Sequence, residues 1–184
     1  AAEGVPRLRW TLAEFERLTE LGIFTEEDRI ELIGGELVPM SPRGNRHELV
    51  RDDLTDLLIR QLPPEVRLAS EIGWRPDADT YLEPDMLVYP RTFKGVTVPG
   101  AEVLLIIEIA DTSLNFDTTA KARASAALGV REYWVVDAKT LVTRIHREPS
   151  AQGFAILSEV LPSETLISAL VPSIAAKLVD LGLD

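Results

Sequence analysis

Two acidic side chains are the residues of this sequence best placed to do chemistry. Asp85 follows a proline and opens the apolar segment DMLVY (85–89), and Glu108 ends the apolar run LLII (104–107). Both segments have the composition of buried strands. If the two strands are neighbours, alternation brings the side chains of Asp85 and Glu108 face to face, at ~5 Å between their Cβ atoms.

A carboxylate pair of this kind predicts a metal site. In apolar surroundings the two groups cannot both stay ionised unless a cation lies between them. The chain contains no cysteine, so thiolate ligands are excluded. Oxygen ligands alone favour a hard cation, and we therefore expect Mg²⁺ or Mn²⁺.

Lys121 is the third candidate. We expect it in the first turn of an alanine-rich helix over residues 118–128, which Asp117 caps and Gly129 ends. A cation gains nothing from the helix dipole there, because a helix N-terminus favours anions. The two carboxylates, or a phosphate held by their metal, would supply the partner that this lysine needs.

Each candidate also has a purely structural explanation. Asp85 can begin a strand at a turn, Glu108 can be an exposed strand end, and Lys121 can extend to water or pair one turn back along its helix. His47 can be a satisfied histidine at the start of its helix, and Glu71, in VRLASEIGW, fits the solvated face of a strand. The combination of two acids on consecutive strands with a lysine on the following helix favours a metal site over these separate explanations.

The elements that must position these residues follow from apolar periodicity, caps and breakers. Thr11 and Glu14 form a capping box, Gly34-Gly35 divides a hairpin, and Pro63-Pro64 stops a helix. The expected order is helix 12–21, hairpin 29–40, helix 46–62, strands 66–74, 85–89 and 102–109, helix 118–128, strands 132–137, 141–147 and 153–160, and a terminal helix over 165–182. This order predicts an α/β or α+β fold, with helices packed on a sheet.

Length and composition set further expectations. The 184 residues suit one domain over the whole chain, with residues 1–10 as a loose N-terminal tail. The net charge of −11 counts against a protein that coats nucleic acid, but not against a local basic strip. No apolar run approaches the ~20 residues of a membrane span, no signal sequence opens the chain, and cysteine is absent. We therefore expect a cytoplasmic protein without membrane partners.

Five motifs in order resemble one nuclease family. They are ELIGGEL (31–37), SPRGNRH (41–47), PD (84–85), EIADTSLNFDTTAK (108–121) and GVREYWVVD (129–137). The pattern of the acid pair and the lysine resembles that of the PD-(D/E)XK nuclease superfamily. The full set is similar to a large bacterial family of restriction endonuclease-like proteins, formerly a domain of unknown function. The resemblance spans about residues 11–161.

The resemblance implies a restriction endonuclease-like fold, in which helices flank a central mixed sheet and a β-hairpin lies near the N-terminus. It implies that Asp85 and Glu108 hold the metal, with the carbonyl of Ile109 as a further ligand. The superfamily lysine normally sits two residues after the glutamate, where this chain has Ala110. In the family the lysine comes from the next helix instead, and Lys121 matches it.

Further positions follow from the same resemblance. Glu31 and His47 match recurrent family positions and are expected as supporting groups, and Glu71 is a weaker candidate for that role. Ser125 departs from the family, in which many members carry a tyrosine there, and we expect this to affect packing.

The implied activity is Mg²⁺- or Mn²⁺-dependent hydrolysis of DNA phosphodiester bonds, with Lys121 as a catalytic residue beside the two acids. A homodimer would suit a double-strand cut. DNA contacts are expected from basic residues at positions 43, 46, 51, 60, 67, 91 and 94. Two alternatives stay open: a non-catalytic binding or assembly module that keeps the fold, favoured by the acidic charge, and a metal-dependent hydrolase of another phosphoester.

Overall fold

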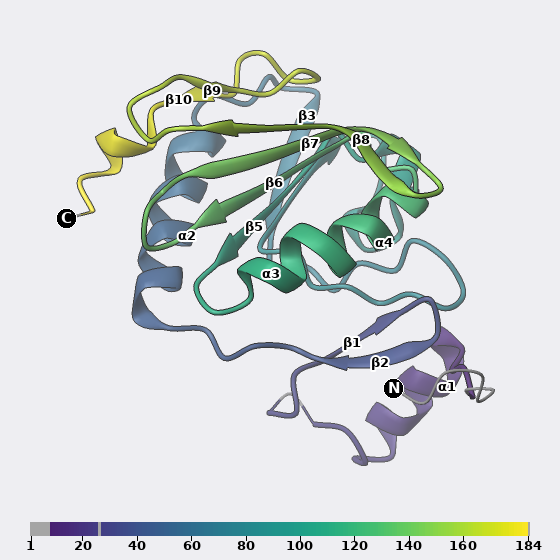
Figure 1. Cartoon of the computed structure of the whole chain (residues 1–184). Coiled ribbons are helices and arrows are strands. Elements are labelled where there is room, and N and C mark those ends of the chain that lie inside the picture. Colours follow the sequence, from purple (N-terminus) through teal and green to yellow (C-terminus); the bar gives the residue numbers. More distant parts are fainter. Residues whose placement is uncertain (1–7, 26, 184) are drawn as a thin grey trace.

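A six-stranded mixed sheet forms the centre of the molecule, shown in Figure 1 as a computed structural model that describes residues 8–25 and 27–183. The spatial order is β3-β4-β5-β6-β7-β8, and only the β5–β6 pair is parallel. A parallel pair needs a crossover connection, which the helical segment between β5 and β6 supplies. The strands are β3 (Val66–Ser70), β4 (Met86–Pro90), β5 (Leu105–Ala110), β6 (Glu132–Asp137), β7 (Thr143–Ser150) and β8 (Gly153–Val160).

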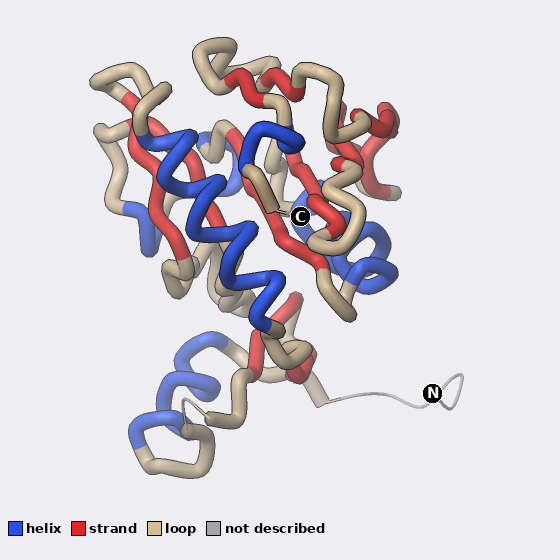
Figure 2. Tube along the Cα trace, turned by 90° about the vertical axis from the view of Figure 1, so that its left-hand side faces the viewer, coloured by secondary structure: helices blue, strands red, loops and turns tan. Residues whose placement is uncertain are grey.

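Helices pack on both faces of this sheet, which confirms the expected fold class. On one face α2 (Asn45–Ile59) buries Val50, Leu54 and Leu58 against even-numbered residues of β4 and odd-numbered residues of β5. Figure 2 shows this helix running along the sheet. On the other face, α3 (Leu114–Phe116), a π-helical turn (Asp117–Lys121) and α4 (Ala122–Ala127) follow one another, and Ala122 packs with Leu87 and Ile106.

The N-terminal part lies at one end of the sheet (Figures 1 and 2). It contains α1 (Leu12–Glu20), which starts with the expected capping box, and the hairpin of β1 (Ile30–Ile33) and β2 (Glu36–Pro39). Backbone bonds between Leu32 and Tyr81, 2.7 and 2.9 Å long, tie β1 to the segment before β4. The first seven residues of the expected tail lie outside the described residues, but Trp10 is not loose, because its N–H donates to Gly35 at 2.9 Å.

The expected terminal helix over 165–182 is wrong. Ser168 hydroxyl donates to the buried Glu132 at 2.8 Å and accepts from the Val171 N–H at 3.2 Å, so it competes with helical bonding, and Pro172 cannot supply a helical donor. Short elements replace the helix: β9 (Leu166–Ile167), β10 (Ala175–Ala176) and a 3₁₀ turn (Leu178–Leu181).

The helix expected over 118–128 also differs, because helical structure begins at Leu114 and Asp117 is not its N-cap. The Ala122 N–H donates to the Asp117 carbonyl five residues back, which makes the π turn. Tyr133 hydroxyl, from β6, donates to the same carbonyl at 3.0 Å. A contact from a later strand therefore fixes the irregular turn.

Smaller differences concern element ends. The strand expected over 66–74 stops at Ser70, because Glu71 has a φ of +50°. The helix expected to residue 62 ends at Ile59, before the prolines. Two 3₁₀ turns, Gly95–Thr97 and Gly100–Glu102, precede β5, and β7 begins at Thr143 rather than at 141. In the described part of the chain, none of the helices has the length and apolar character that a membrane crossing requires.

Candidate active site

Asp85 and Glu108 lie opposite each other, where β4 begins and β5 nears its end. Met86 pairs with Ile107, and one further step of this antiparallel register places Asp85 against Glu108. Both side chains face the helical segment of α3 and α4, on the side of Leu87, and each residue is only 4% exposed. The predicted juxtaposition of the two acids is therefore present, in a pocket that both residues line.

Asp85 is held through one of its two carboxylate oxygens. Oδ2 accepts the Ile109 N–H at 2.8 Å and lies 3.1 Å from His47 Nε2. Oδ1 lies 3.8 Å from Arg43 Nη2. Burial raises the pKa of Asp85, but the hydrogen bond and charge of His47, the Ile109 N–H and the charge of Lys121 together outweigh burial and hold the pKa below its usual range. An ionised carboxylate with one oxygen fixed and one facing a cation is suited to metal binding.

Lys121 joins Glu108 to the hairpin. Its ammonium lies 3.1 Å from Glu108 Oε1 and 3.0 Å from Glu31 Oε1, and the three side chains are buried. Glu31, on β1, also accepts the Glu83 N–H at 2.9 Å. Burial lowers the pKa of Lys121, but the carboxylates of Glu108 and Glu31 outweigh it, so the pKa is raised. The ammonium therefore stays charged, and the alternative that it extends to water is wrong.

Glu108 is the least satisfied acid of the pocket. Burial raises its pKa well above the usual range, and the nearby charge of Asp85 adds to the rise, against the lowering effect of Lys121. Although Lys121 is close, Oε1 of Glu108 accepts no well-aligned hydrogen bond within the described residues. A buried carboxylate oxygen that lacks a well-aligned donor is costly. A bound cation would remove that cost.

The donor set fits a hard divalent cation. Ile109 directs its N–H to Asp85, and in an extended strand the carbonyl of the same residue points to the same edge. No cluster of three or more His, Asp or Glu side chains suited to a metal occurs in residues 8–25 and 27–183. Mg²⁺ is commonly held by one or two carboxylates, with water and substrate oxygens completing its shell. Two carboxylates and one carbonyl match that requirement.

The position of Lys121 accounts for the missing lysine at Ala110. Ala110 lies on the same strand face as Glu108 and packs in one buried cluster with Ala122. Small side chains let the helical segment lie close to β5. The Lys121 ammonium, on this segment, thereby comes within 3.1 Å of Glu108. Ser125 is also buried under the segment, at 1% exposure, where the family often has a tyrosine.

The structure corrects the expectations for two acidic residues, Asp117 and Glu71. Asp117 lines the pocket instead of capping a helix, and burial raises its pKa to about 6. The position of Asp117 in the motif EIADTSLNFDTTAK, between Glu108 and Lys121, could have indicated that it belongs to the pocket. Glu71 is no member of the acid cluster: it is exposed and binds Arg43 and, at 2.8 Å, Arg51. Its side chain reaches the site through Arg43, and its backbone N–H donates to the Asp85 carbonyl at 3.2 Å.

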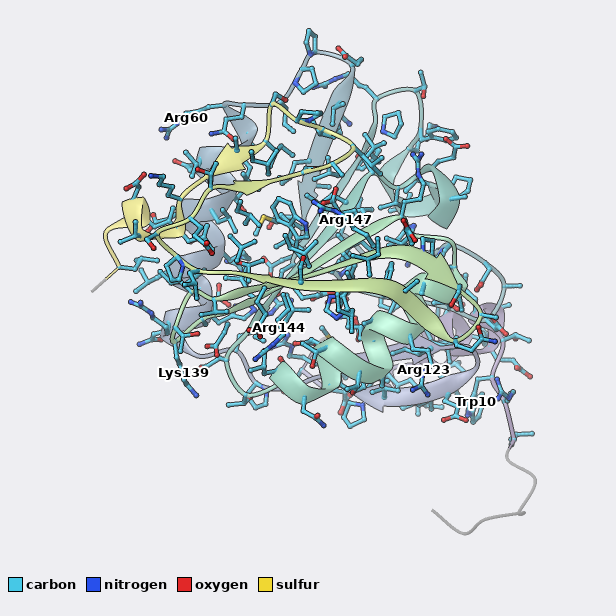
Figure 3. The ribbon with its side chains drawn as sticks, turned by 45° about the horizontal axis from the view of Figure 1, so that its top comes forward. Trp10, Arg60, Arg123, Lys139, Arg144 and Arg147 are labelled. Atoms are coloured by element: carbon cyan, nitrogen blue, oxygen red, sulfur yellow. The ribbon has the colours of Figure 1, made fainter. Side chains whose placement is uncertain are left out.

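Most arginines of the expected basic strip have intramolecular partners. Arg46 donates to the carbonyls of Ala138 and Leu183, and Arg91 to those of Pro64 and Val66. Arg60 pairs with Asp56 on the outer end of α2 (Figure 3). Only Arg43 of this set lines the pocket.

Comparison with known proteins agrees with this architecture. A family model described as "Putative restriction endonuclease" (Uma2) matches residues 12–178. The chain belongs to this family. A solved structure of a "putative nuclease" from Anabaena variabilis superposes with a TM-score of 0.74 at 16% identity, covering 94% of this chain and 97% of that one. At that identity the likeness shows the shared fold alone. A search of curated proteins found no match to the chain.

Proposed function

We propose that this protein is an endonuclease that hydrolyses DNA phosphodiester bonds with the help of Mg²⁺ or Mn²⁺. Membership of the restriction endonuclease family supports a nuclease-like function. The observation that carries the finer proposal is the meeting of Asp85, Glu108 and Lys121 in one buried pocket. Asp85 and Glu108 would hold the metal, with the carbonyl of Ile109. When bound, the metal supplies a water of lowered pKa and polarises a phosphoryl oxygen.

The chain itself provides the positioning. Lys121, held charged between Glu108 and Glu31, would orient the attacking water and stabilise the negative charge that develops on the phosphoryl oxygens. His47 keeps Oδ2 of Asp85 engaged, so that Oδ1 stays directed into the pocket. No cysteine is present to act as a covalent nucleophile, so direct attack by water is the simplest course.

The competing possibility is a module that keeps the fold without catalysis. Lys121 neutralises part of the acid cluster, and a cluster of this kind can serve stability alone. The incomplete satisfaction of Glu108 favours the catalytic proposal. Its Oε1 has the Lys121 ammonium at 3.1 Å but accepts no well-aligned hydrogen bond within the described residues, and a structural cluster gains nothing from a poorly satisfied buried acceptor. Cleavage of both strands by a homodimer is part of the proposal.

The test combines metal binding and cleavage. We expect isothermal titration to detect Mn²⁺ binding that Asp85→Ala abolishes. We expect relaxation of supercoiled plasmid in Mn²⁺ that falls at least about 100-fold in Glu108→Gln and Lys121→Ala. Arg60→Ala, purified in parallel, should cleave normally because it changes only an exposed ion pair.

Two results would decide against the proposal. Cleavage that persists in both site variants identifies a contaminating nuclease. Absence of Mn²⁺ binding by the wild-type protein favours the non-catalytic module. If Mn²⁺ binds but plasmid is not cut, a panel of phosphomonoesters and other phosphodiesters tests the hydrolase of a different phosphoester.

A further inference from the structure

Arg43 occupies an unusual place between the loop after β2 and the acid pocket. Its guanidinium binds Glu71 at the rim and places Nη2 3.8 Å from Asp85 Oδ1. That Nη2 is buried and donates no hydrogen bond within the described residues. The guanidinium of Arg43 therefore faces Oδ1 of Asp85, the oxygen that a metal would need, without a hydrogen bond to it.

Arg29 lines the same pocket beside Arg43. No ion pair in the described part of the chain involves its side chain. Burial lowers the pKa of Arg29, and the like charge of Arg43 lowers it further. Two guanidinium groups therefore line one pocket, and the carboxylates that act on Arg29, those of Glu83, Asp85 and Glu48, lie beyond ion-pair distance from it.

Backbone strain marks the same rim. Arg29 has a φ of +45° and Glu71, the anchor of Arg43, a φ of +50°. A non-glycine residue in this left-handed region costs roughly 1–2 kcal/mol, and such residues concentrate at functional sites. Two of the four non-glycine residues with positive φ in the described part of the chain are thus Arg29, which lines the pocket with Arg43, and Glu71, which binds Arg43; the others are Leu141 and Glu148.

We propose that Arg29 and Arg43 form a binding site for a backbone phosphate of the nucleic acid substrate, and that Arg43 leaves Asp85 when a divalent cation binds there. This inference rests on the proposed function. A cation at Asp85 Oδ1 would repel the guanidinium 3.8 Å away. The released fork of Arg43 suits phosphate oxygens, which it can bind bidentately.

The proposal gives Arg43 opposite effects on two ligands. It opposes the metal, because both cations compete for one carboxylate oxygen. It favours the substrate, because it neutralises a phosphate. A residue that only supports the fold would weaken both ligands together, so the opposite signs are diagnostic.

Mn²⁺ titration without DNA tests the first effect. We expect Arg43→Ala to bind Mn²⁺ about three- to tenfold more tightly than the wild type, because a nearby positive charge is removed. Arg60→Ala is the matched control: it makes the same change in net charge, at an exposed site on the outer end of α2 (Figure 3). Its Mn²⁺ affinity should stay within about twofold of the wild type.

DNA affinity in Mn²⁺ tests the second effect, measured by fluorescence anisotropy with a labelled duplex. All proteins carry Lys121→Met, so that the DNA is not consumed. In this background, adding Arg43→Ala or Arg29→Ala should weaken binding about tenfold. Each should also reduce the slope of log affinity against log salt by about 1, the value for one phosphate contact. Arg60→Ala should leave the slope unchanged.

The outcomes separate this proposal from the proposed function. Unchanged Mn²⁺ affinity and salt slope in Arg43→Ala, with Mn²⁺ binding still abolished by Asp85→Ala, overturns the role of Arg43 and leaves the nuclease proposal standing. If Arg60→Ala changes the Mn²⁺ affinity and the salt slope as much as Arg43→Ala does, the changes come from net charge alone, and the role of Arg43 is again overturned. A wild-type protein that binds no Mn²⁺ overturns both.

Discussion

Two buried glutamates on adjacent strands, Glu132 in β6 and Glu108 in β5, have opposite surroundings. Glu132 is fully buried, and both of its oxygens are satisfied. Glu108 is nearly as enclosed, but its Oε1, 3.1 Å from the Lys121 ammonium, accepts no well-aligned hydrogen bond from the residues that the structure describes. Glu132 receives donors from Arg147 at 2.6 and 2.9 Å, Trp134 at 3.0 Å, Ser168 at 2.8 Å and the Ala169 N–H at 2.9 Å.

The contrast separates a structural acid from a candidate ligand. The donors of Glu132 come from β6, β7 and the C-terminal segment, so the carboxylate fastens that segment to the sheet. Glu108 has a single cationic neighbour, Lys121, which it shares with Glu31. Burial alone therefore does not identify a functional acid; unfilled acceptor capacity beside a second acid is the more informative feature.

The largest effect on stability is expected at the structural acid. Glu132→Gln keeps the size of the side chain but removes its charge, and an amide NH₂ would face donors such as Ser168 hydroxyl and Arg147. Because breaking a buried ion pair leaves its partner uncompensated, we expect a loss of about 3 kcal/mol in the free energy of unfolding. Urea denaturation measures it. A loss below about 1 kcal/mol would show that these contacts contribute little.

The next effect depends on pH and concerns Asp117, whose pKa is raised from 3.8 to about 6 in the folded protein. The folded state then binds the proton more tightly than the unfolded state. Asp117 contributes most stability below about pH 4, and that contribution is lost as pH rises through 6. We expect Asp117→Asn to gain about 2 kcal/mol relative to the wild type between pH 4.5 and 7.5. Urea melts at both pH values measure it, and parallel pH profiles of the two proteins would contradict it.

A smaller effect is expected from the contact that holds the π turn. Tyr133→Phe keeps the buried ring but removes the hydroxyl that donates to the Asp117 carbonyl at 3.0 Å. The loss of one buried hydrogen bond should cost about 1 kcal/mol in the free energy of unfolding. Because the turn orients Lys121, plasmid cleavage should fall as well. Tyr81→Phe, which removes a hydroxyl bond to Glu83 away from this turn, is the control for loss of a tyrosine hydroxyl.

Strand alternation predicted the acid pair, on the condition that the two strands are neighbours. In the segments that hold Asp85 and Glu108, apolar residues alternate between two separate clusters, and the order of elements left these strands as neighbours. The helix that carries His47 was equally visible, because its apolar stripe has the helical period. Periodic patterns of this kind predict structure reliably because the apolar side chains that form them are the ones that pack into the hydrophobic core.

Features that depend on distant partners could not be predicted. The π turn exists where Tyr133, a residue of the following strand, satisfies the Asp117 carbonyl. The C-terminal segment is not helical because Ser168 reaches Glu132, 36 residues earlier in the chain. The contact of Arg43 with Asp85 depends on Glu71 and its left-handed backbone. In each case a tertiary contact overrides the local preference.

The smallest stability effect, and the sharpest test of the contrast, is expected at Glu108 itself. Glu108→Gln makes the same isosteric change as Glu132→Gln. It removes a buried charge with an unsatisfied oxygen, and Lys121 keeps Glu31 as a partner at 3.0 Å. The raised pKa of Glu108 means that the fold stabilises its ionised form poorly, so we expect the free energy of unfolding to change by less than about 1 kcal/mol, with stabilisation the favoured sign.

Glu108→Gln should nonetheless abolish Mn²⁺ binding in titration calorimetry, whereas Glu132→Gln should bind Mn²⁺ like the wild type at a temperature where it remains folded. The two variants should therefore differ: one loses stability and the other loses metal affinity. This difference follows only if the incompletely satisfied carboxylate of Glu108 serves to bind a ligand. If Glu108→Gln is instead destabilised as much as Glu132→Gln, Lys121 and Glu108 form a structural ion pair. The lower hydrogen-bond count at Glu108 would then carry no functional meaning.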